Sequence, residues 1–596
     1  MKNFKEGNEL VLFGKTITRK RLILICWIVA IILGAFQAWD TRHYVNPDGL
    51  SYLDMGDAYL RGDWDMAINA YWSPFYSWLT GLTLSIIKPS PYWEASVIHL
   101  LNFLIFLGSM ACFHFFLNQL IKYNQFQIER NKKTKYQSFP EWAWIILGYS
   151  LFIWTSLDLI TLTKVTPDIC LTGFVYLSCG LLIRMRMGFS SVFICILFGI
   201  VLGFGYLVKV PSLPIAFFFL GSSIFMIGHF RNNWTRVLIS SLSFAIVCGS
   251  FAIMLSKEQG RFTFGDSGKL NYAWYVNGVS MWVHWQGDEL KSGTPMHPTR
   301  KISDKPVIYE FEIPIQCTYP PWYDPAYWHE GLTIYFNIKQ QIAVLQYIIE
   351  NFYVNLFFQL QAPLVVGFLI FFLTGWNRPD NHKILLKQWP LLIPAIIAMS
   401  MFALVHVETR FLGAYIVLLW LGLFSGIHLF QSSKSIKWAK NIILAVVITL
   451  MTITVIPFGM RTYHLFADLI GGKSVWVHKH FQVAQGIKQL NIHDGDKVGF
   501  IGHAIDAYWA RLASIQIIAE IPYNNIDSFW AADSAVKKKA FQIFSDIHAK
   551  AVLTSEVPQY ALLSEWQRLG DTGYFFYDLR KKSIGEEKNS ETVIIE

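Results

Sequence analysis

Long apolar runs separated by short polar loops are the feature that most constrains how this chain folds. About eleven runs have a length near the ~20 residues that cross the hydrocarbon core of a bilayer. Only 15% of the 596 residues are charged and 53% are hydrophobic, whereas soluble proteins carry about 25% charge. The composition excludes an ordinary soluble enzyme, a disordered chain and a nucleic-acid binder. The sequence therefore predicts an α-helical polytopic membrane protein with spans near 21–39, 95–121, 142–158, 168–186, 190–208, 211–229, 237–256, 353–375, 389–406, 411–430 and 440–458.

The basic residues predict the orientation of these spans. Clusters such as Lys122 to Lys135 follow alternate runs, and the other short loops carry one basic residue each, namely Lys164, Lys209 and Arg410. Cytoplasmic loops are enriched in Lys and Arg, so all clusters lie on one side if the N-terminus is cytoplasmic. The net charge of +9 is therefore a topology signal. We expect a protein of the bacterial inner (plasma) membrane whose C-terminal part is extracytoplasmic.

Three longer segments are expected outside the membrane, at 40–94, 257–352 and 460–596. In the first, the apolar stretch Phe75 to Lys88 is short and begins among aromatic residues, which favours an interfacial helix over a span.

The last segment alternates predicted helices and strands, which is typical of a small α/β domain with a mainly parallel sheet. The predicted helix is 479–490, and the predicted strands are 497–501, 515–521 and 551–554. We therefore expect a transmembrane domain at 1–459 and an extracytoplasmic α/β domain at 460–596.

The first external segment contains the most informative acidic residue, Asp48. Asn46, Pro47 and Gly49 mark a turn, and a helix is expected to follow and to end at Gly62. A carboxylate at this helix start can act as general base on an acceptor hydroxyl or amine. It can equally cap the helix, since Asp is a preferred N-cap residue. Further along the expected helix, Asp54 and Asp57 share one face, which favours solvated side chains over metal ligands.

The same segment resembles a known superfamily. Its motifs are Pro47-Asp48-Gly49 with Tyr52 and Leu53, a Gly62-Asp63-Trp64 turn, and Tyr71-Trp72-Ser73-Pro74-Phe75. These residues resemble the GT-C glycosyltransferases, which include protein O-mannosyltransferases and the aminoarabinose transferase of lipid A. The resemblance implies a membrane enzyme that moves a sugar from a polyprenyl-phosphate donor to a lipid, glycan or protein acceptor. Asp48 matches the essential acid of the first loop. Many members carry two adjacent acids there, whereas Gly49 follows here, so no cofactor is certain and a divalent metal stays open.

Other external loops supply candidate ligands of the donor phosphate. Arg410-Phe411 matches an Arg–aromatic pair of the superfamily, and a guanidinium suits a phosphate through charge and forked geometry. The alternatives are an interfacial anchor or a pair with Glu408. Lys209 and Lys164 are further candidate phosphate ligands. Asp168 resembles the second acidic position of the superfamily, with a helix cap as the equally weighted alternative.

Aromatic residues outside the membrane suit the flat faces of sugar rings, and they equally suit a loop packed at the interface. The candidate sugar or acceptor contacts are Tyr52, Trp72, Trp274, Tyr275 and, beside Arg410, Glu408. The loop at 257–352 also contains His284-Trp285 and Tyr319-Pro-Pro-Trp322. In the C-terminal segment, the residues around His503 lack the GxGxxG of a dinucleotide site. We expect that segment to be an accessory or acceptor-recognition module.

The runner-up function is a transporter or flippase of lipid-linked glycans, and a non-enzymatic scaffold is a third hypothesis. Transporters place ionisable residues near the middle of the bilayer. Here the acids and bases gather at the external ends of the spans, which favours chemistry at the outer interface. The expected partners are therefore a lipid-phosphate sugar donor, its acceptor and membrane lipids.

Overall fold

A computed structural model describes residues 10–12, 15–130, 136–224, 230–281, 284–375, 385–427, 429–430, 433–471, 478–561 and 563–581. The chain divides into two compact units, each assembled from three separate stretches. We call them the helical unit (Met1–Arg42, His99–Phe264, Phe336–Val475) and the mixed unit (His43–Ile98, Gly265–Tyr335, Trp476–Glu596). These units are interleaved along the chain, and the predicted division into 1–459 and 460–596 stays a prediction.

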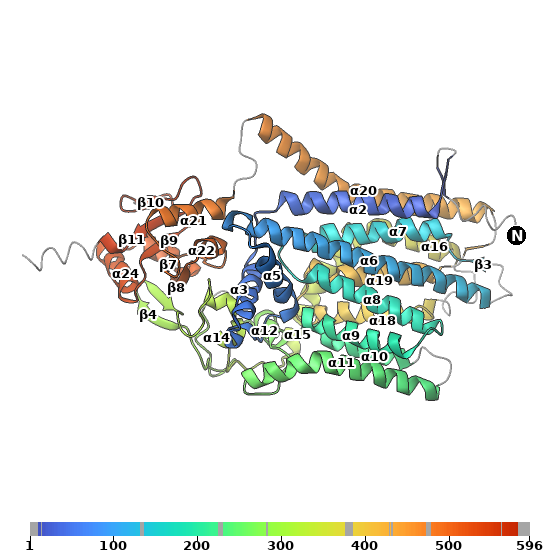
Figure 1. Ribbon diagram of the computed structural model, residues 1–596, viewed down its shortest axis with the longest axis horizontal. Coiled ribbons are helices and arrows are strands. Elements are labelled where there is room, and N and C mark those ends of the chain that lie inside the picture. Colours follow the sequence, from blue (N-terminus) through green and yellow to red (C-terminus); the bar gives the residue numbers. More distant parts are fainter. Residues whose placement is uncertain are drawn as a thin grey trace, which may run out of the picture. The chain divides into compact units, whose positions relative to one another are not determined.

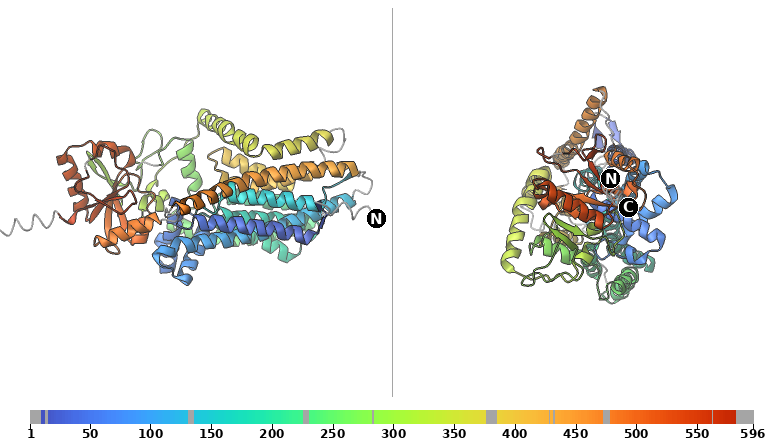
Figure 2. Two further views of the ribbon diagram at one scale, coloured as in Figure 1. Left: turned by 90° about the horizontal axis from the view of Figure 1, so that it is seen from above. Right: turned by 90° about the vertical axis from the view of Figure 1, so that its left-hand side faces the viewer.

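Among the described residues, six helices are long and apolar enough to cross a membrane, which makes the chain an integral membrane protein. They are α2 (Arg19–Asp40), α6 (Glu94–Arg130), α7 (Glu141–Trp154) continued by the π-helix η2 (Thr155–Ile160), α8 (Asp168–Arg186), α11 (Phe230–Glu258) and α20 (Ser433–Ile470). The shorter apolar helices are α9 (Val192–Val208), α10 (Ser212–Ile224), α18 (Trp389–Ala403) and α19 (Thr409–Ser425). Figures 1 and 2 show these helices side by side.

Two predicted spans differ from the structure. The run expected at 411–430 ends as a helix at Ser425 and its last residues form β6 (Leu429–Phe430), and residues 225–229 of the run expected at 211–229 lie outside the described residues. The second difference is larger. The run expected at 353–375 begins earlier, in α15 (Ile338–Ile348), and passes through the π-helical turns η3 (Ile349–Tyr353) and η4 (Leu356–Leu360). It then bends by 71° before α16 (Ala362–Gly375). The π turns insert extra residues into the helical ladder, which apolar periodicity does not register.

Small residues let helices of this unit approach closely. Helix α9 packs along α11, and a Cβ on Gly199 would lie 2.1 Å from the Ser240 carbonyl oxygen. Such close backbone contact is a common way to hold helices together in a membrane, where lipid is as apolar as the side chains.

The mixed unit is built around a seven-stranded sheet in the order β10-β11-β9-β7-β8-β5-β4. Its central strands β7 (Lys497–Ile501), β8 (Gln516–Ile521) and β9 (Ala551–Thr554) are parallel and occupy the three predicted strand positions. The prediction of a mainly parallel sheet is wrong, because both edges are antiparallel. These edge strands are β4 (Arg300–Asp304), β5 (Val307–Glu310), β10 (Gln567–Arg568) and β11 (Phe575–Asp578). The residues of β4 and β5 lie in the polar loop at 257–352 and do not alternate between apolar and polar side chains, so the sequence did not predict these two strands.

Helices cover this sheet and carry the first loop. The predicted helix at 479–490 is α21 (Lys479–Gln489), and Phe529 and Phe544 are fully buried in the core. The other helices of the unit are α3 (Pro47–Arg61), α4 (Trp64–Ala67), α5 (Pro74–Ile87), η1 (Pro91–Trp93), α12 (Ser267–Tyr275), α13 (Pro320–Tyr323), α14 (Pro325–Trp328), α22 (Tyr508–Ala513), η5 (Tyr523–Asn525), α23 (Ile526–Trp530) and α24 (Ser534–Asp546). Two-stranded pairs β1 (Leu10–Leu12) with β2 (Lys15–Ile17), and β3 (Tyr136–Gln137) with β6 (Leu429–Phe430), belong to the helical unit.

Helices α3 and α5 of the first loop cross at a pair of glycines. A Cβ on Gly81 would lie 2.8 Å from the Gly56 carbonyl oxygen, and a Cβ on Gly56 would meet the Ser77 carbonyl oxygen at 2.9 Å. The side of α5 away from this crossing is exposed and apolar, with Ile86 71% exposed. This two-sided helix has the character expected of an interfacial segment, and the crossing positions the helix that begins beside Asp48.

Candidate active site

In the helical unit, four charged residues from three loops meet in one cluster. Asp168 begins α8, Lys209 connects α9 to α10, and Arg410 lies in the first turn of α19. The Lys209 ammonium donates to the Asp168 carboxylate at 2.6 Å, and Arg410 approaches the other oxygen of Asp168 at 3.7 Å. Arg410 also forms a two-pronged pair with Glu408, through Nε at 2.9 Å and Nη2 at 3.0 Å. We call these residues the ionic cluster.

The members of the ionic cluster differ in exposure. The Asp168 side chain is 1% exposed, whereas that of Glu408 is 34% exposed. Burial lowers the pKa of Lys209 despite the neighbouring Asp168. Burial opposes ionisation of Glu408, but the hydrogen bond from His406 and the charge of Arg410 outweigh it, so its pKa lies below the usual value. Because buried charges require partners, the deeply buried Asp168 holds Lys209 in place, while the more exposed Glu408 is the carboxylate that is freer to move.

The aromatic residue predicted beside Arg410 also joins the cluster. The Lys209 ammonium lies 3.9 Å from the Phe411 ring centroid, and the Arg410 guanidinium carbon lies 5.3 Å from it. Of the predicted phosphate ligands, Lys164 stands apart. Its carbonyl accepts from Asn102, and no described contact joins its side chain to the ionic cluster.

Asp48 lies in the first turn of α3, in the mixed unit. The N-cap position belongs to Asn46, and Asp48 is half-buried within the helix. A carboxylate in a first turn interacts favourably with the helix dipole. The pKa of the nearby Tyr44 phenol is raised by burial and then by the negative charges of Asp506 and Asp48. The C-terminal part of the unit therefore contributes Asp506 to the electrostatic surroundings of Asp48, which the sequence pattern did not reveal.

The acids further along α3 have a different role from the one expected. Asp54 and Asp57 were predicted to form a solvated face, but both pair with Arg511 of α22, at 2.8 Å and 2.6 Å. Arg511 also pairs with Glu94 through two of its nitrogens. Asp54 in addition accepts from the Thr318 backbone N–H and hydroxyl. Arg511 was missed as a structural residue because its partners lie on segments far away in the sequence.

The predicted sugar-contacting aromatics belong to one packed group in the mixed unit. Tyr52 is 3% exposed and packs edge-on against Trp72 at 5.2 Å between ring centroids. Trp274 is 6% exposed and stacks on Trp322 at 6.3 Å. Tyr275 is more open, at 36%. Tyr52, Trp72 and Trp274 thus serve mainly as packing residues.

The described residues contain no group of three or more His, Cys, Asp or Glu side chains placed to hold a metal ion. The acids around Asp54 already have the Arg511 guanidinium as their cation.

These features define a polytopic membrane protein with an ionic cluster at its helix ends and a separate mixed α/β unit. No family model matches the chain, and no curated protein matches it. Among solved structures, it is similar to an oligosaccharyltransferase from Archaeoglobus fulgidus in complex with Zn and sulfate, with 13% identity and a TM-score of 0.47. That match covers 89% of this chain and 67% of the other.

A second solved structure is ArnT from Cupriavidus metallidurans bound to undecaprenyl phosphate. The identity is 11%, the TM-score is 0.48, and the match covers 94% of this chain and 98% of the other. Both proteins are members of the GT-C superfamily that the first loop resembles. At these identities and scores, the similarity does not extend to an activity, a substrate or a set of site residues.

Proposed function

We propose that the chain is a membrane glycosyltransferase that moves a sugar from a polyprenyl-phosphate donor to an acceptor on the extracytoplasmic side. The observation that carries this proposal is the ionic cluster. It gathers Lys209 and Arg410, two hundred positions apart in the sequence, around one buried carboxylate at the ends of apolar helices. Two cations at the end of a helix bundle suit a lipid phosphate, whose chain lies among the helices and whose charge stays at the interface.

The exposed fractions of the four side chains in the ionic cluster indicate how a phosphate enters it. The forked face of Arg410 is occupied by Glu408, which is the most exposed of the four side chains. A donor phosphate can displace Glu408 toward solvent and take over the two-pronged contact. Displacing Asp168 instead would leave a carboxylate that is 1% exposed without its lysine, which is far more costly. Lys209 and Arg410 are therefore the proposed phosphate ligands, with Asp168 as their positioning residue.

The proposed reaction needs one proton acceptor and one stabilised leaving group. Asp48 accepts the proton of the acceptor hydroxyl or amine as that atom attacks the anomeric carbon. The bond between the anomeric carbon and the phosphate oxygen breaks, and its electron pair leaves with the lipid phosphate. Arg410 and Lys209 stabilise the charge that develops on that phosphate. A phosphate is already a good leaving group, so a general acid is not required.

Transfer of a labelled sugar in proteoliposomes tests the proposal. The full chain is reconstituted with a radiolabelled polyprenyl-phosphate sugar and an extract of envelope acceptors, and the label in the acceptor fraction is counted. Asp48→Asn should reduce transfer at least about a hundredfold, the lower end of the contribution of a general base. The matched control is Asp65→Asn, an exposed acid in the same loop, which should transfer like wild type.

Full transfer by Asp48→Asn would contradict the assignment of the base. Movement of the labelled donor between leaflets without any transfer by the wild-type chain would instead establish the transporter hypothesis.

A further inference from the structure

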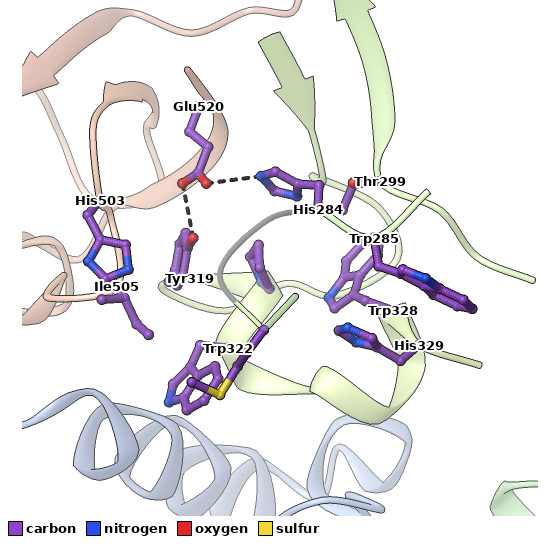
Figure 3. A pocket seen from close by; sticks show the side chains of 12 residues that line it. His284, Trp285, Thr299, Tyr319, Trp322, Trp328, His329, His503, Ile505 and Glu520 are labelled. Atoms are coloured by element: carbon purple, nitrogen blue, oxygen red, sulfur yellow. Dashed lines mark hydrogen bonds and ion pairs between the residues drawn. The ribbon is translucent and has the colours of Figure 1, made fainter. Parts of the chain in front are cut away.

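A pocket in the mixed unit contains a buried carboxylate that the proposed reaction does not use. Glu520 lies on β8, where it is 5% exposed in a strand whose other residues are nearly all apolar. Its two oxygens accept from His284 Nε2 and the Tyr319 hydroxyl, each at 3.0 Å (Figure 3). A carboxylate can accept about four hydrogen bonds, and the described protein groups supply two to Glu520. The carboxylate is thus held in a fixed orientation and keeps capacity for a ligand.

Aromatic rings form the rest of this pocket. The twelve residues that line it are Met281, His284, Trp285, Thr299, Tyr319, Pro321, Trp322, Trp328, His329, His503, Ile505 and Glu520. Trp285 lies parallel to the His329 ring at 5.7 Å, and the Trp328 indole donates to the Pro320 carbonyl. Figure 3 shows Glu520, His284 and Tyr319 joined by hydrogen bonds, with the tryptophans below and beside them. Rings held by other contacts lose little freedom when a ligand binds.

His329 adds a neutral aromatic face whose two ring nitrogens already have protein partners. Burial lowers the pKa of its imidazole to about 4, so the ring is uncharged at pH 7. Its Nδ1 faces the Pro325 carbonyl at 2.8 Å, and its Nε2 accepts from the Trp274 indole. These two contacts place the proton on Nδ1.

The charge of the pocket selects its ligand. Among the twelve lining residues there is no Lys or Arg, and Glu520 supplies a negative charge. The lining therefore offers a phosphate no guanidinium or ammonium partner, which argues against the lipid-phosphate donor. Flat aromatic faces beside an oriented carboxylate and imidazoles suit a ring that has apolar C–H faces and hydroxyl or amino donors at its edge. That description fits a sugar without a phosphate.

We propose that this pocket, whose cavity of about 50 Å³ admits one edge of a sugar ring, binds the hydroxyl- or amino-bearing edge of a sugar unit, and that the sugar belongs to the acceptor. Binding of the sugar in this pocket does not require the lipid-phosphate sugar donor. Only its assignment to the acceptor rests on the proposed transferase function. The chemical class of the acceptor is then a glycan or glycolipid, recognised by the loop at 257–352 together with the C-terminal sheet.

Direct binding to the full chain tests this inference. The chain is placed in phosphatidylcholine nanodiscs without any sugar-containing detergent, and saturation-transfer difference NMR is recorded. The probes are methyl glucoside, its 2-amino-2-deoxy analogue and glucose 1-phosphate. The first two should receive saturation from the wild-type chain, and the phosphate should not. Glu520→Gln should weaken binding about tenfold or more, with the larger loss for the amino sugar, because a charge-assisted hydrogen bond is removed.

Two further variants keep the test decisive if Glu520→Gln folds poorly. His503→Trp adds bulk from a partly exposed lining position and should block both sugars. Asp527→Asn, an exposed acid on α23, is the matched control and should bind like wild type. The tryptic fragment pattern of each variant checks its fold. Failure of the wild-type chain to bind either sugar, or equal binding by wild type, Glu520→Gln and His503→Trp, would overturn the pocket assignment.

Transfer kinetics separate this inference from the proposed function. Glu520→Gln should raise the KM for the acceptor while the KM for the donor stays unchanged. A wild-type chain that binds the sugars in nanodiscs but transfers none would leave the pocket intact and refute the transferase proposal. Unchanged acceptor KM in Glu520→Gln would refute the acceptor assignment.

Discussion

Replacing Arg511 with methionine should open the mixed unit while leaving its apolar core unaltered. Arg511→Met keeps much of the side-chain length but removes the cation that Asp54, Asp57 and Glu94 share. The side chains of Arg511 and Asp54 are each 9% exposed and that of Glu94 is 17% exposed, so water cannot take over the role of the guanidinium. The Asp57 side chain is 34% exposed and adds less, because solvent screens it.

The magnitude follows from this burial. Removing one partner of a buried ion pair costs about 3–5 kcal/mol. Since each 1.4 kcal/mol is a factor of ten, the opened population of the unit should rise by at least about a hundredfold. Proteolysis in the regime of fast opening and closing measures that population. The assay is trypsin digestion of the reconstituted chain, with fragments identified by mass spectrometry. Arg568→Met, which loses only the exposed pair with Asp571, is the control and should change the rate little.

The pH dependence distinguishes lost charge pairing from lost packing. Burial raises the pKa of Asp54, and the charge of Arg511 opposes that effect. Without Arg511 the folded-state pKa rises further above the unfolded value. A raised carboxyl pKa favours the folded state at low pH and disfavours it as pH increases through the folded pKa. The Arg511→Met defect should therefore be large at pH 8 and smaller at pH 5, and Arg511→Met with Glu94→Gln should recover part of the stability. An equal defect at both pH values would refute this reasoning.

Three further outcomes are expected. Arg410→Lys keeps the charge but loses the fork, so the KM for the donor in the transfer assay should rise about tenfold, whereas Lys164→Gln, outside the ionic cluster, should change it little. Burial raises the pKa of Asp324 to about 7, so its cost to folding grows from the unfolded pKa of about 4 up to pH 7 and is then constant. Asp324→Asn should therefore increase the melting temperature at pH 8 more than at pH 6, and a loss at pH 8 would contradict this. Gly81→Val places side-chain atoms against the Gly56 carbonyl and should destabilise the α3–α5 crossing by about 1–3 kcal/mol, measured as a lower melting temperature with reduced transfer.

The sequence predicted the helical character of the membrane part well, because a bilayer imposes a simple requirement on composition and length. Every predicted apolar run contains a helix among the described residues, and the parallel strands β7, β8 and β9 lie where alternation and turn residues placed them. The same rules missed β4 and β5. Strand β5 is extended because it pairs with β8, and β4 because it pairs with β5, and neither reason is present in their own residues.

The candidate site, too, was predicted only in part. Single loops identified Asp168, Lys209 and Arg410 one at a time, since an isolated charge at the end of an apolar run is conspicuous. No local pattern encodes which of these charges pair. The ion pair of Asp168 with Lys209 and that of Glu408 with Arg410 are seen only in the folded chain. A lone Glu520 inside an apolar strand was a usable signal that the sequence analysis passed over.

What the sequence determined by itself was where apolar helices form and which residue types stand at their ends, because hydrophobic transfer energies act on each segment independently. Only the tertiary structure decided which charges neutralise one another. Asp54 and Asp57 looked solvated until Arg511, more than four hundred residues away, was placed between them. The energy of a charge depends on its burial and on its nearest partner, and both are properties of the folded chain.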